Sequence, residues 1–317
     1  MIGCLVGSEM CIRDSQRRGG RGVQGASSRE EDFVEHLFVA NTHSYILFFT
    51  DKGKCYWVKV YDIPEGGRAA KGRAIVNLVG CEPDEKVSAF ISVKEFNDDH
   101  FVVMATEKGI VKKTKLSAYS NPRKKGIYAV EIRDGDKLIE ARVSTGDNDI
   151  LLGTRNGKSI RFSEEQIRPS GRKTMGVKGI TLSSEDDRLV GMLLIKREGT
   201  TVLVATEKGF GKRTEISQYR AQKRGGKGVL TMKTTDKVGK MVTIKEVVDK
   251  DDLMIITNQG VLIRQPVSQI RAIGRATQGV KLIKLGEGTL VSSITRIMSE
   301  EDSGDENDSA EPKDNTE

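Results

Sequence analysis

The sequence has few of the residues that build metal sites and disulfide frameworks. Its 317 residues include only four cysteines and three histidines. No C-x-x-C pair occurs among Cys4, Cys11, Cys55 and Cys81, and the histidines are not spaced as a ligand cluster. We therefore expect buried thiols and surface imidazoles in a reducing, cytoplasmic compartment, with no metal site.

Long apolar runs and catalytic signatures are also missing. No stretch reaches the roughly 18 apolar residues that a membrane-spanning helix needs, so no membrane partner is expected. The chain has no G-x-S-x-G, no Walker loop and no paired metal ligands, which argues against an independent enzyme. Aromatic residues make up only 5% of the chain, so Val, Ile, Leu and Thr must fill the core.

Positive charge, by contrast, is abundant and unevenly distributed. The chain has 52 Lys and Arg against 45 Asp and Glu, a formal net charge of +7. Segment 298–317 contains nine acidic residues and one lysine, so it carries −8 and leaves +15 on residues 1–297. A body this basic indicates a polyanionic partner, and so acidic a tail is expected to be disordered.

The first fifteen residues differ in character from the rest. The segment MIGCLVGSEMCIRDS lacks the basic start of a signal peptide, and charged residues interrupt its apolar run. It resembles translated sequencing-adapter sequence. We therefore interpret residues 1–15 as a non-native leader, residues 16–297 as one domain, and residues 298–317 as the disordered acidic tail.

Short β-rich runs that end at a turn glycine recur along the chain. The separations between these glycines are 56, 48, 52 and 51 residues. A second β-like run follows each turn, which predicts a hairpin whose glycine supplies the positive φ of a tight turn. The hairpin glycines are Gly53, Gly109, Gly157, Gly209 and Gly260.

A second glycine follows each hairpin at an almost constant distance. The offsets are 19, 17, 19, 19 and 19 residues, to Gly72, Gly126, Gly176, Gly228 and Gly279. Gly22 lies 50 residues before Gly72 and begins this series, although no hairpin precedes it. Further β-like runs follow, so each repeat predicts four short strands in a propeller-like array, and six second glycines predict six blades.

The loop around Gly22 has the character of a phosphate-binding turn. Arginine offers a fixed fork of donors that matches phosphate oxygens, and glycine lets a duplex approach the backbone amides. Arg- and Gly-rich runs also occur in disordered tails and plain surface turns, so composition alone leaves both interpretations open. The loop reads Gln16, Arg17, Arg18, Gly19, Gly20, Arg21 and Gly22.

Basic residues recur before the second glycines and after the hairpin turns. On equivalent blades they would form a positive belt around one rim. Such a belt suits a bent duplex, because bending 20 to 30 base pairs costs about 1 to 6 kcal/mol and needs many distributed contacts. For any single lysine, keeping a blade edge soluble is the alternative. The predicted rim residues are Arg68, Lys71, Arg73, Lys112, Lys113, Arg123, Lys124, Lys125, Arg172, Lys173, Lys212, Arg213, Lys223, Arg224, Lys227, Arg271 and Arg275.

The loop from Gln16 to Gly22 resembles the gyrase A box, Q-R-R-G-G-[KR]-G, at every position. Glu31-Asp32-Phe33, Ile75-Val76-Asn77-Leu78 and Gly211-Lys212-Arg213-Thr214 are similar to the same family, the C-terminal domain of the DNA gyrase A protein. The resemblance covers residues 16 to about 297. It implies an all-β, six-bladed β-pinwheel with strands exchanged between four-stranded blades. An incomplete first blade is the alternative, because the leader replaces its first strands.

The resemblance also implies a role and partners. The domain would wrap double-stranded DNA beside the N-terminal cleavage core of the same polypeptide, so that ATP-driven strand passage introduces negative supercoils. Its partners would be DNA, that core and the ATPase subunit in an A2B2 complex, at the nucleoid of a bacterial cytoplasm. The catalytic tyrosine, ATP and Mg would belong to other parts of that complex, which leaves this chain without cofactor, metal or catalytic residue.

Two other functions stay open at this point. A propeller-type scaffold could use a basic rim to bind an acidic protein, and binding that salt does not weaken would favour it. The related domain of topoisomerase IV is the second alternative, because it resembles the same family. It lacks an intact box, however, whereas this chain has one.

Removal of the acidic tail is expected to tighten DNA binding, because the tail competes with DNA for the basic rim. Truncation after Ile297 should raise the affinity for duplex DNA at low salt, measured by fluorescence anisotropy. A 317-residue control with neutral amides in place of the tail carboxylates should match the truncation. Unchanged or weaker affinity would refute this role and leave the tail as a solubility element.

Overall fold

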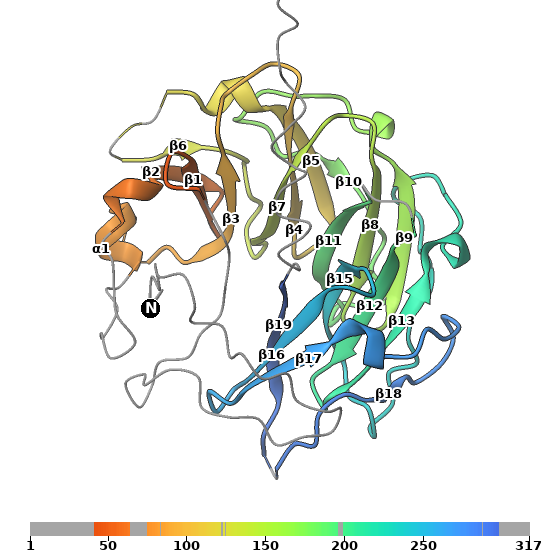
Figure 1. Cartoon of the computed structure of the whole chain (residues 1–317). Coiled ribbons are helices and arrows are strands. Elements are labelled where there is room, and N and C mark those ends of the chain that lie inside the picture. Colours follow the sequence, from red (N-terminus) through yellow and green to blue (C-terminus); the bar gives the residue numbers. More distant parts are fainter. Residues whose placement is uncertain are drawn as a thin grey trace, which may run out of the picture.

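The computed structural model describes residues 41–63, 75–82, 84–121, 123, 125–195, 199–286 and 288–297. Its strands form five antiparallel sheets, four of which contain four strands and one of which contains three. The sheets are arranged around a common centre like the blades of a propeller (Figure 1). The leader and the acidic tail predicted from the sequence lie outside the described residues.

Each sheet is built on a hairpin rich in β-branched and aliphatic residues, which favour strands. All five predicted hairpin glycines have positive φ, between +75° and +83°, so this prediction is confirmed. The hairpins join β1 (Tyr45–Thr50) to β2 (Lys54–Lys59), β4 (Phe101–Thr106) to β5 (Ile110–Lys115), β8 (Asp149–Thr154) to β9 (Lys158–Ser163), β12 (Thr201–Thr206) to β13 (Phe210–Glu215), and β16 (Asp252–Thr257) to β17 (Leu262–Pro266).

A third strand of each sheet pairs with the first strand of its hairpin and lies nearest the centre (Figure 1). Successive innermost strands contact one another, which holds the sheets together around that centre. The innermost strands are β3 (Val87–Val93), β7 (Leu138–Ser144), β11 (Leu189–Ile195), β15 (Met241–Val247) and β19 (Val291–Ile297).

The outermost strand of four sheets is donated by the next repeat. Each donated strand begins directly after a second glycine and pairs with β2, β5, β9 or β13 of the preceding repeat. The structure thus shows the exchange of strands that the family resemblance implied. The donated strands are β6 (Ile127–Tyr128), β10 (Val177–Lys178), β14 (Val229–Leu230) and β18 (Val280–Lys281).

Helical segments are short and occupy connections. A single turn of 3-10 helix follows each hairpin and leads into the loop before the donated strand. These turns are η1 (Val60–Asp62), η2 (Leu116–Tyr119), η3 (Glu164–Gln166), η4 (Ile216–Gln218) and η5 (Val267–Gln269), and the α-helix α1 (Ile75–Val79) precedes β3.

The prediction of six blades is wrong, because the described part of the chain forms five. The count rested on the second glycines, which number six in the sequence, whereas only five hairpin glycines occur. A blade is built on a hairpin, while a second glycine marks only the strand that a repeat donates to its neighbour. Counting second glycines therefore gave one sheet more than the described residues form.

The core lies between adjacent sheets, and side chains of one strand serve two interfaces in alternation. In β4, Val102 and Met104 pack toward the first sheet, whereas Val103 and Ala105 pack toward the third. Because successive side chains point to opposite faces, a strand covered on both sides must be apolar at nearly every position. This explains the continuous runs of Val, Ile and Leu before each hairpin glycine.

Gly228, the residue before β14, is expected to be intolerant of a side chain. Its φ is +69°, and a Cβ would lie 2.3 Å from the carbonyl oxygen of Ser159 in the neighbouring repeat. Gly228→Ala should lower the free energy of unfolding by about 2 kcal/mol or more, measured by urea denaturation. Gly171→Ala is the matched control, since Gly171 has nothing within 4 Å of its Cβ position. Equal stability of the two variants would contradict this account.

Candidate nucleic-acid interface

The loops that lead into the donated strands lie at the outer edge of the propeller. We call residues 167–176, 219–228 and 270–279 the rim loops. Each runs from a 3-10 turn to a second glycine and joins the sheet of one repeat to that of the preceding repeat. Several predicted contact residues fall outside the described part of the chain: Gln16, Arg17, Arg18, Gly19, Gly20, Arg21, Gly22, Arg68, Lys71, Arg73 and Lys124.

Nine of the predicted contact residues do face solvent at this edge. They lie in the rim loops or in the equivalent loop before β6. Because these loops occupy the same place on successive sheets, their charges follow one another along the rim. Arg123, Lys125, Lys173, Lys223, Lys227 and Arg271 are exposed, and Arg172, Arg224 and Arg275 are half-buried.

Four other predicted rim residues are buried instead. Lys112, Lys113, Lys212 and Arg213 have relative exposures of 1%, 4%, 0% and 6%. They lie in β5 and β13, which are covered by the neighbouring sheet and by the donated strand. In this fold these side chains cannot reach a phosphate, so the part of the rim prediction that included them is not supported by the structure.

Lys212 is buried beneath the rim loop 270–279 and binds its backbone. Its Nζ donates hydrogen bonds to the carbonyl oxygens of Gly274, at 2.7 Å, and Arg275, and lies 3.2 Å from Oγ1 of Thr277. All three partners are neutral oxygens of the rim loop 270–279. Burial lowers the pKa of Lys212 to about 8, and the nearby charge of Arg275 acts in the same direction.

Lys112 makes the equivalent contacts two blades earlier. Its Nζ donates to the carbonyl oxygens of Ala129, at 2.8 Å, and Arg172. Burial again lowers the pKa to about 8, with the charge of Arg172 as a second cause. Arg172 and Arg275 each stand four residues before a second glycine. In two repeats, therefore, a buried ammonium group fixes the backbone of the arginine at the equivalent position of the rim loop.

The next basic residue along each of these strands pairs with acidic groups. Nζ of Lys113 lies 2.8 Å from Oε1 of the buried Glu164 and 4.2 Å from the ring centroid of Phe101. Arg213 bonds the carbonyl oxygen of Ile270 at 2.6 Å and forms an ion pair with Asp249. These cations stabilise the blade and are neutralised within it.

Two arginines of the rim loops are fixed at the surface by hydrogen bonds to backbone carbonyl oxygens. Nη1 of Arg224 donates to the carbonyl oxygen of Lys178 at 3.1 Å, and Nη1 of Arg275 donates to that of Leu230 at 3.0 Å. The backbone N–H groups of Arg224 and Arg275 donate to the side chains of Gln166 and Gln218. Each half-exposed guanidinium is thus fixed against the donated strand of the preceding sheet, as a pre-organised phosphate contact would be.

Sequence reasoning missed three lysines at this edge. Lys178 and Lys281 are exposed on donated strands, and Lys158 is half-buried at the start of β9. Their signal was present, since Lys158 directly follows a hairpin glycine and the other two stand two residues after a second glycine. They are separated from the basic clusters, which is why a search for clustered charge passed over them.

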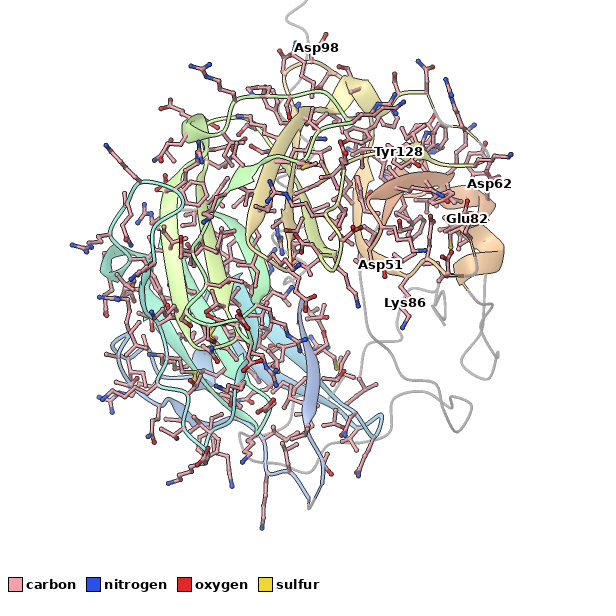
Figure 2. The ribbon with its side chains drawn as sticks, turned by 180° about the vertical axis from the view of Figure 1, so that it is seen from behind. Asp51, Asp62, Glu82, Lys86, Asp98 and Tyr128 are labelled. Atoms are coloured by element: carbon pink, nitrogen blue, oxygen red, sulfur yellow. The ribbon has the colours of Figure 1, made fainter. Side chains whose placement is uncertain are left out.

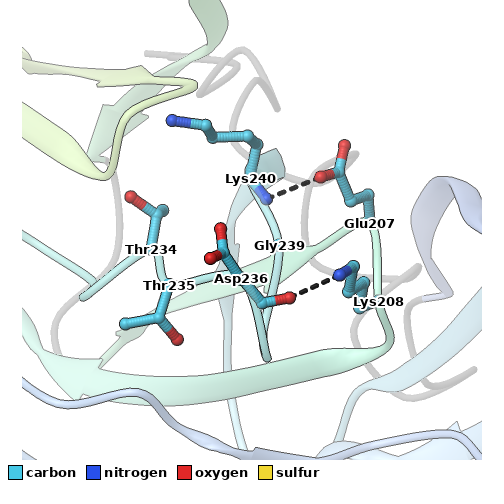
Figure 3. A pocket seen from close by; sticks show the side chains of 7 residues that line it. All are labelled: Glu207, Lys208, Thr234, Thr235, Asp236, Gly239 and Lys240. Carbon is cyan, nitrogen blue, oxygen red and sulfur yellow. Dashed lines mark hydrogen bonds between the residues drawn. The ribbon is translucent and has the colours of Figure 1, made fainter.

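A small cavity of about 130 Å³ lies beside the turn between β12 and β13 (Figure 3). Its lining includes Glu207, Lys208, Asp236 and Lys240. The N–H of Lys240 donates to Glu207 at 2.9 Å, and Nζ of Lys208 bonds the carbonyl oxygen of Asp236. Nζ of Lys240 donates to Oδ1 of Asn156 at 2.7 Å, so these bonds tie the two turns that line the cavity to each other and to the neighbouring sheet.

Other kinds of functional site find little support within the described ranges. They contain no group of three or more His, Cys, Asp or Glu side chains that could hold a metal ion. Cys55 and Cys81 are buried free thiols. None of the helices in this part of the chain is long and apolar enough to cross a membrane. The rim is therefore the surface on which a function can be argued.

Lys212→Met is expected to destabilise the domain by an amount that grows with pH. The pKa is about 8 in the folded chain and about 10.4 in an unfolded one. The unfolded state therefore binds more protons between these values, and the free energy of unfolding of the wild type rises with pH there. The variant loses this rise, so its deficit should grow by about 1 to 2 kcal/mol between pH 8 and 9.5, measured by urea denaturation. Lys223→Met, at an exposed site, should show no such change, and a deficit independent of pH would contradict the assignment.

Comparison with known proteins agrees with this geometry. A family model described as the DNA gyrase C-terminal domain, a beta-propeller, matches residues 12–41, 44–94, 100–145, 148–196, 200–247 and 251–297. The last five segments each contain the hairpin and innermost strand of one sheet. The first begins inside the leader segment 1–15 and lies outside the described residues except for its last position.

Curated relatives point the same way. The gyrase A protein of Staphylococcus epidermidis (strain ATCC 12228 / FDA PCI 1200) is 46% identical over 290 residues, which cover 91% of this chain and 32% of the relative. The gyrase A protein of Staphylococcus aureus (strain NCTC 8325 / PS 47) is 45% identical over 304 residues, covering 95% and 34%. The chain thus spans about a third of the length of these relatives.

Two solved structures share the fold. The DNA gyrase A C-terminal domain matches with a TM-score of 0.77 and 23% identity, covering 90% of this chain and 93% of that one. The C-terminal domain of DNA topoisomerase IV matches with a TM-score of 0.74 and 25% identity, covering 81% and 80%. The match to the family model over nearly the whole domain, together with 46% identity to a gyrase A protein, shows that this chain belongs to the family of DNA gyrase C-terminal beta-propeller domains.

Proposed function

We propose that the domain binds double-stranded DNA and bends it along the rim. The observation that carries the proposal is the repeated placement of Arg224 and Arg275, whose guanidinium groups are fixed against the outer strand of successive sheets. Exposed cations accompany them in the same loops, Lys223 and Lys227 beside Arg224 and Arg271 beside Arg275. A set of cations repeated at the period of the fold is what a regular polyanion requires.

The magnitudes favour an extended rim over a single patch. Bending a duplex of 20 to 30 base pairs by 40° to 90° costs about 1 to 6 kcal/mol, which must be offset by contacts spread along the bend. Sequence-independent wrapping by repeated basic contacts on a curved path is known from histones. Fixed arginines suit this task because little side-chain freedom remains to be lost when DNA binds.

In the whole gyrase A protein, the wrapped DNA would be presented to an N-terminal cleavage core. An ATPase subunit in an A2B2 complex would then drive strand passage that introduces negative supercoils, as in an ATP-dependent type IIA topoisomerase of a bacterial nucleoid. ATP and Mg would be used by those other parts, and this domain would contribute DNA geometry without catalysis. The Arg17-Arg18-Gly19-Gly20-Arg21-Gly22 sequence favours gyrase over topoisomerase IV, whose related domain lacks an intact box.

Wrapping in a positive sense predicts a measurable change in DNA topology. Relaxed plasmid incubated with the 317-residue chain and a nicking-closing topoisomerase should acquire positive linking-number changes in proportion to bound protein. The change should disappear at high salt, because phosphate contacts are lost with counterion uptake. Unchanged topoisomers, or negative ones, at a salt concentration where the chain binds DNA would overturn the proposal.

A scaffold function predicts a different pattern. The chain would bind an acidic protein with little dependence on salt and would show no affinity for duplex DNA even at low salt. A titration of the chain with duplex DNA at low salt therefore separates the two functions.

A further inference from the structure

The outer edge of the second, third and fourth sheets carries a repeated pair of unlike side chains. In each sheet, the last residue of the donated strand lies directly opposite the first residue of the second hairpin strand. Lys178 is opposite Ile110, Leu230 is opposite Lys158, and Lys281 is opposite Phe210. We call these the outer-edge pairs. Each joins one cation to one apolar residue, although the strand that supplies the cation alternates from sheet to sheet.

The two side chains of an outer-edge pair lie on the same face of their sheet. Residues directly opposite each other in antiparallel strands have neighbouring Cβ atoms on one side of the pleat. In the fourth sheet, Nζ of Lys281 lies 5.8 Å from the ring centroid of Phe210. Leu230 remains 37% exposed. Ile110 and Phe210 are half-buried. The pairs thus place an ammonium group beside an apolar side chain that is exposed in the third sheet and partly exposed in the second and fourth.

The pairs are connected to the rim-loop arginines. Arg224 bonds the carbonyl oxygen of Lys178, and Arg275 bonds that of Leu230. A fixed guanidinium group is therefore anchored to the backbone of the outer-edge pair in both the second and the third sheet. In these two sheets the pair and an arginine of a rim loop lie side by side at the outer edge.

The first sheet has a similar pair with a different environment. Tyr128 lies opposite Lys54 and is 54% exposed. Nζ of Lys54, however, lies 2.9 Å from Glu82 and 2.7 Å from the buried Glu85. Figure 2 shows Tyr128, Asp62 and Glu82 around this sheet. Because its cation is neutralised, this pair is unsuited to an anion and is not part of the inferred set.

One repeat unit of a DNA strand offers the complementary chemistry. A phosphate carries the negative charge, and the adjoining deoxyribose presents C–H groups of low polarity. We propose that each outer-edge pair of the second, third and fourth sheets grips one phosphate–deoxyribose unit, with the lysine on the phosphate and the apolar side chain on the sugar. This inference rests on the proposed function and assigns its contacts to residues outside the clustered charges. Such contacts hold the backbone without reading the base sequence.

The charged half is tested by the salt dependence of DNA binding. The affinity of the 317-residue chain for a linear duplex is measured against salt concentration for Lys158→Gln, Lys178→Gln and Lys281→Gln combined. Three lost phosphate contacts should reduce the slope of log K against log salt by about 2.7. The matched control combines Lys86→Gln, Lys137→Gln and Lys240→Gln, three exposed lysines that precede the innermost strands β3, β7 and β15. It removes the same net charge and should leave the slope nearly unchanged.

The apolar half is tested by Leu230→Ser. Loss of a leucine–sugar contact should weaken duplex binding roughly threefold at every salt concentration, without changing the slope. Binding of inorganic polyphosphate, which has no sugar, should be unaffected. Leu290→Ser is the control, because Leu290 is 40% exposed but lies before β19, away from the outer edge.

The outcomes separate the two proposals. If the wild-type chain fails to bind duplex DNA at low salt, the proposed function itself is wrong. If the wild type binds and both lysine combinations change the slope equally, only the assignment of the outer-edge pairs is overturned. If Leu230→Ser weakens polyphosphate as much as DNA, or weakens neither, the sugar contact is wrong. Urea unfolding of every variant excludes loss of fold as the cause.

Discussion

The pairing of a two-residue strand with the sheet of the preceding repeat is the interaction on which the rest of the structure depends. It requires a glycine with positive φ directly before the strand, packed so closely on the neighbouring backbone that Gly228 leaves 2.3 Å between a would-be Cβ and the carbonyl of Ser159. The rim loops begin in one repeat and end as part of another, so their position is set by two sheets at once. A surface made of such loops has little freedom to rearrange.

Buried lysines extend this constraint from the strands to the loops. Lys112 and Lys212 donate to the backbone carbonyls of Arg172 and Arg275 from inside the blade. At the surface, the side chains of Gln166 and Gln218 accept hydrogen bonds from the backbone N–H groups of Arg224 and Arg275. A buried ammonium group among neutral oxygens is costly, and its use here indicates that loop placement matters. Two of the buried lysines therefore order the rim, while other basic residues of the same loops face solvent on it.

Much of the repeat was readable from the sequence, because a hairpin glycine and the apolar run before it are local signals. The positive φ of Gly53 and Gly157 was predicted on that basis. Strand donation could not be predicted from the pattern, because two residues such as Val229 and Leu230 carry no periodicity. For this reason the predicted number of blades was six rather than five. The burial of Lys212 was equally invisible, because its partner Arg275 stands 63 residues later. Contacts at that distance exist only once neighbouring sheets have docked.

The donated strands also have a mechanical consequence. A pull on any rim loop is passed by backbone hydrogen bonds to the sheet before it and along the chain to the sheet after it, so two blades share each load. Because adjacent blades share a strand, one blade cannot separate without breaking the strand pairing with its neighbour. An array of sheets joined in this way can carry tension from one sheet to the next even though each donated strand is only two residues long.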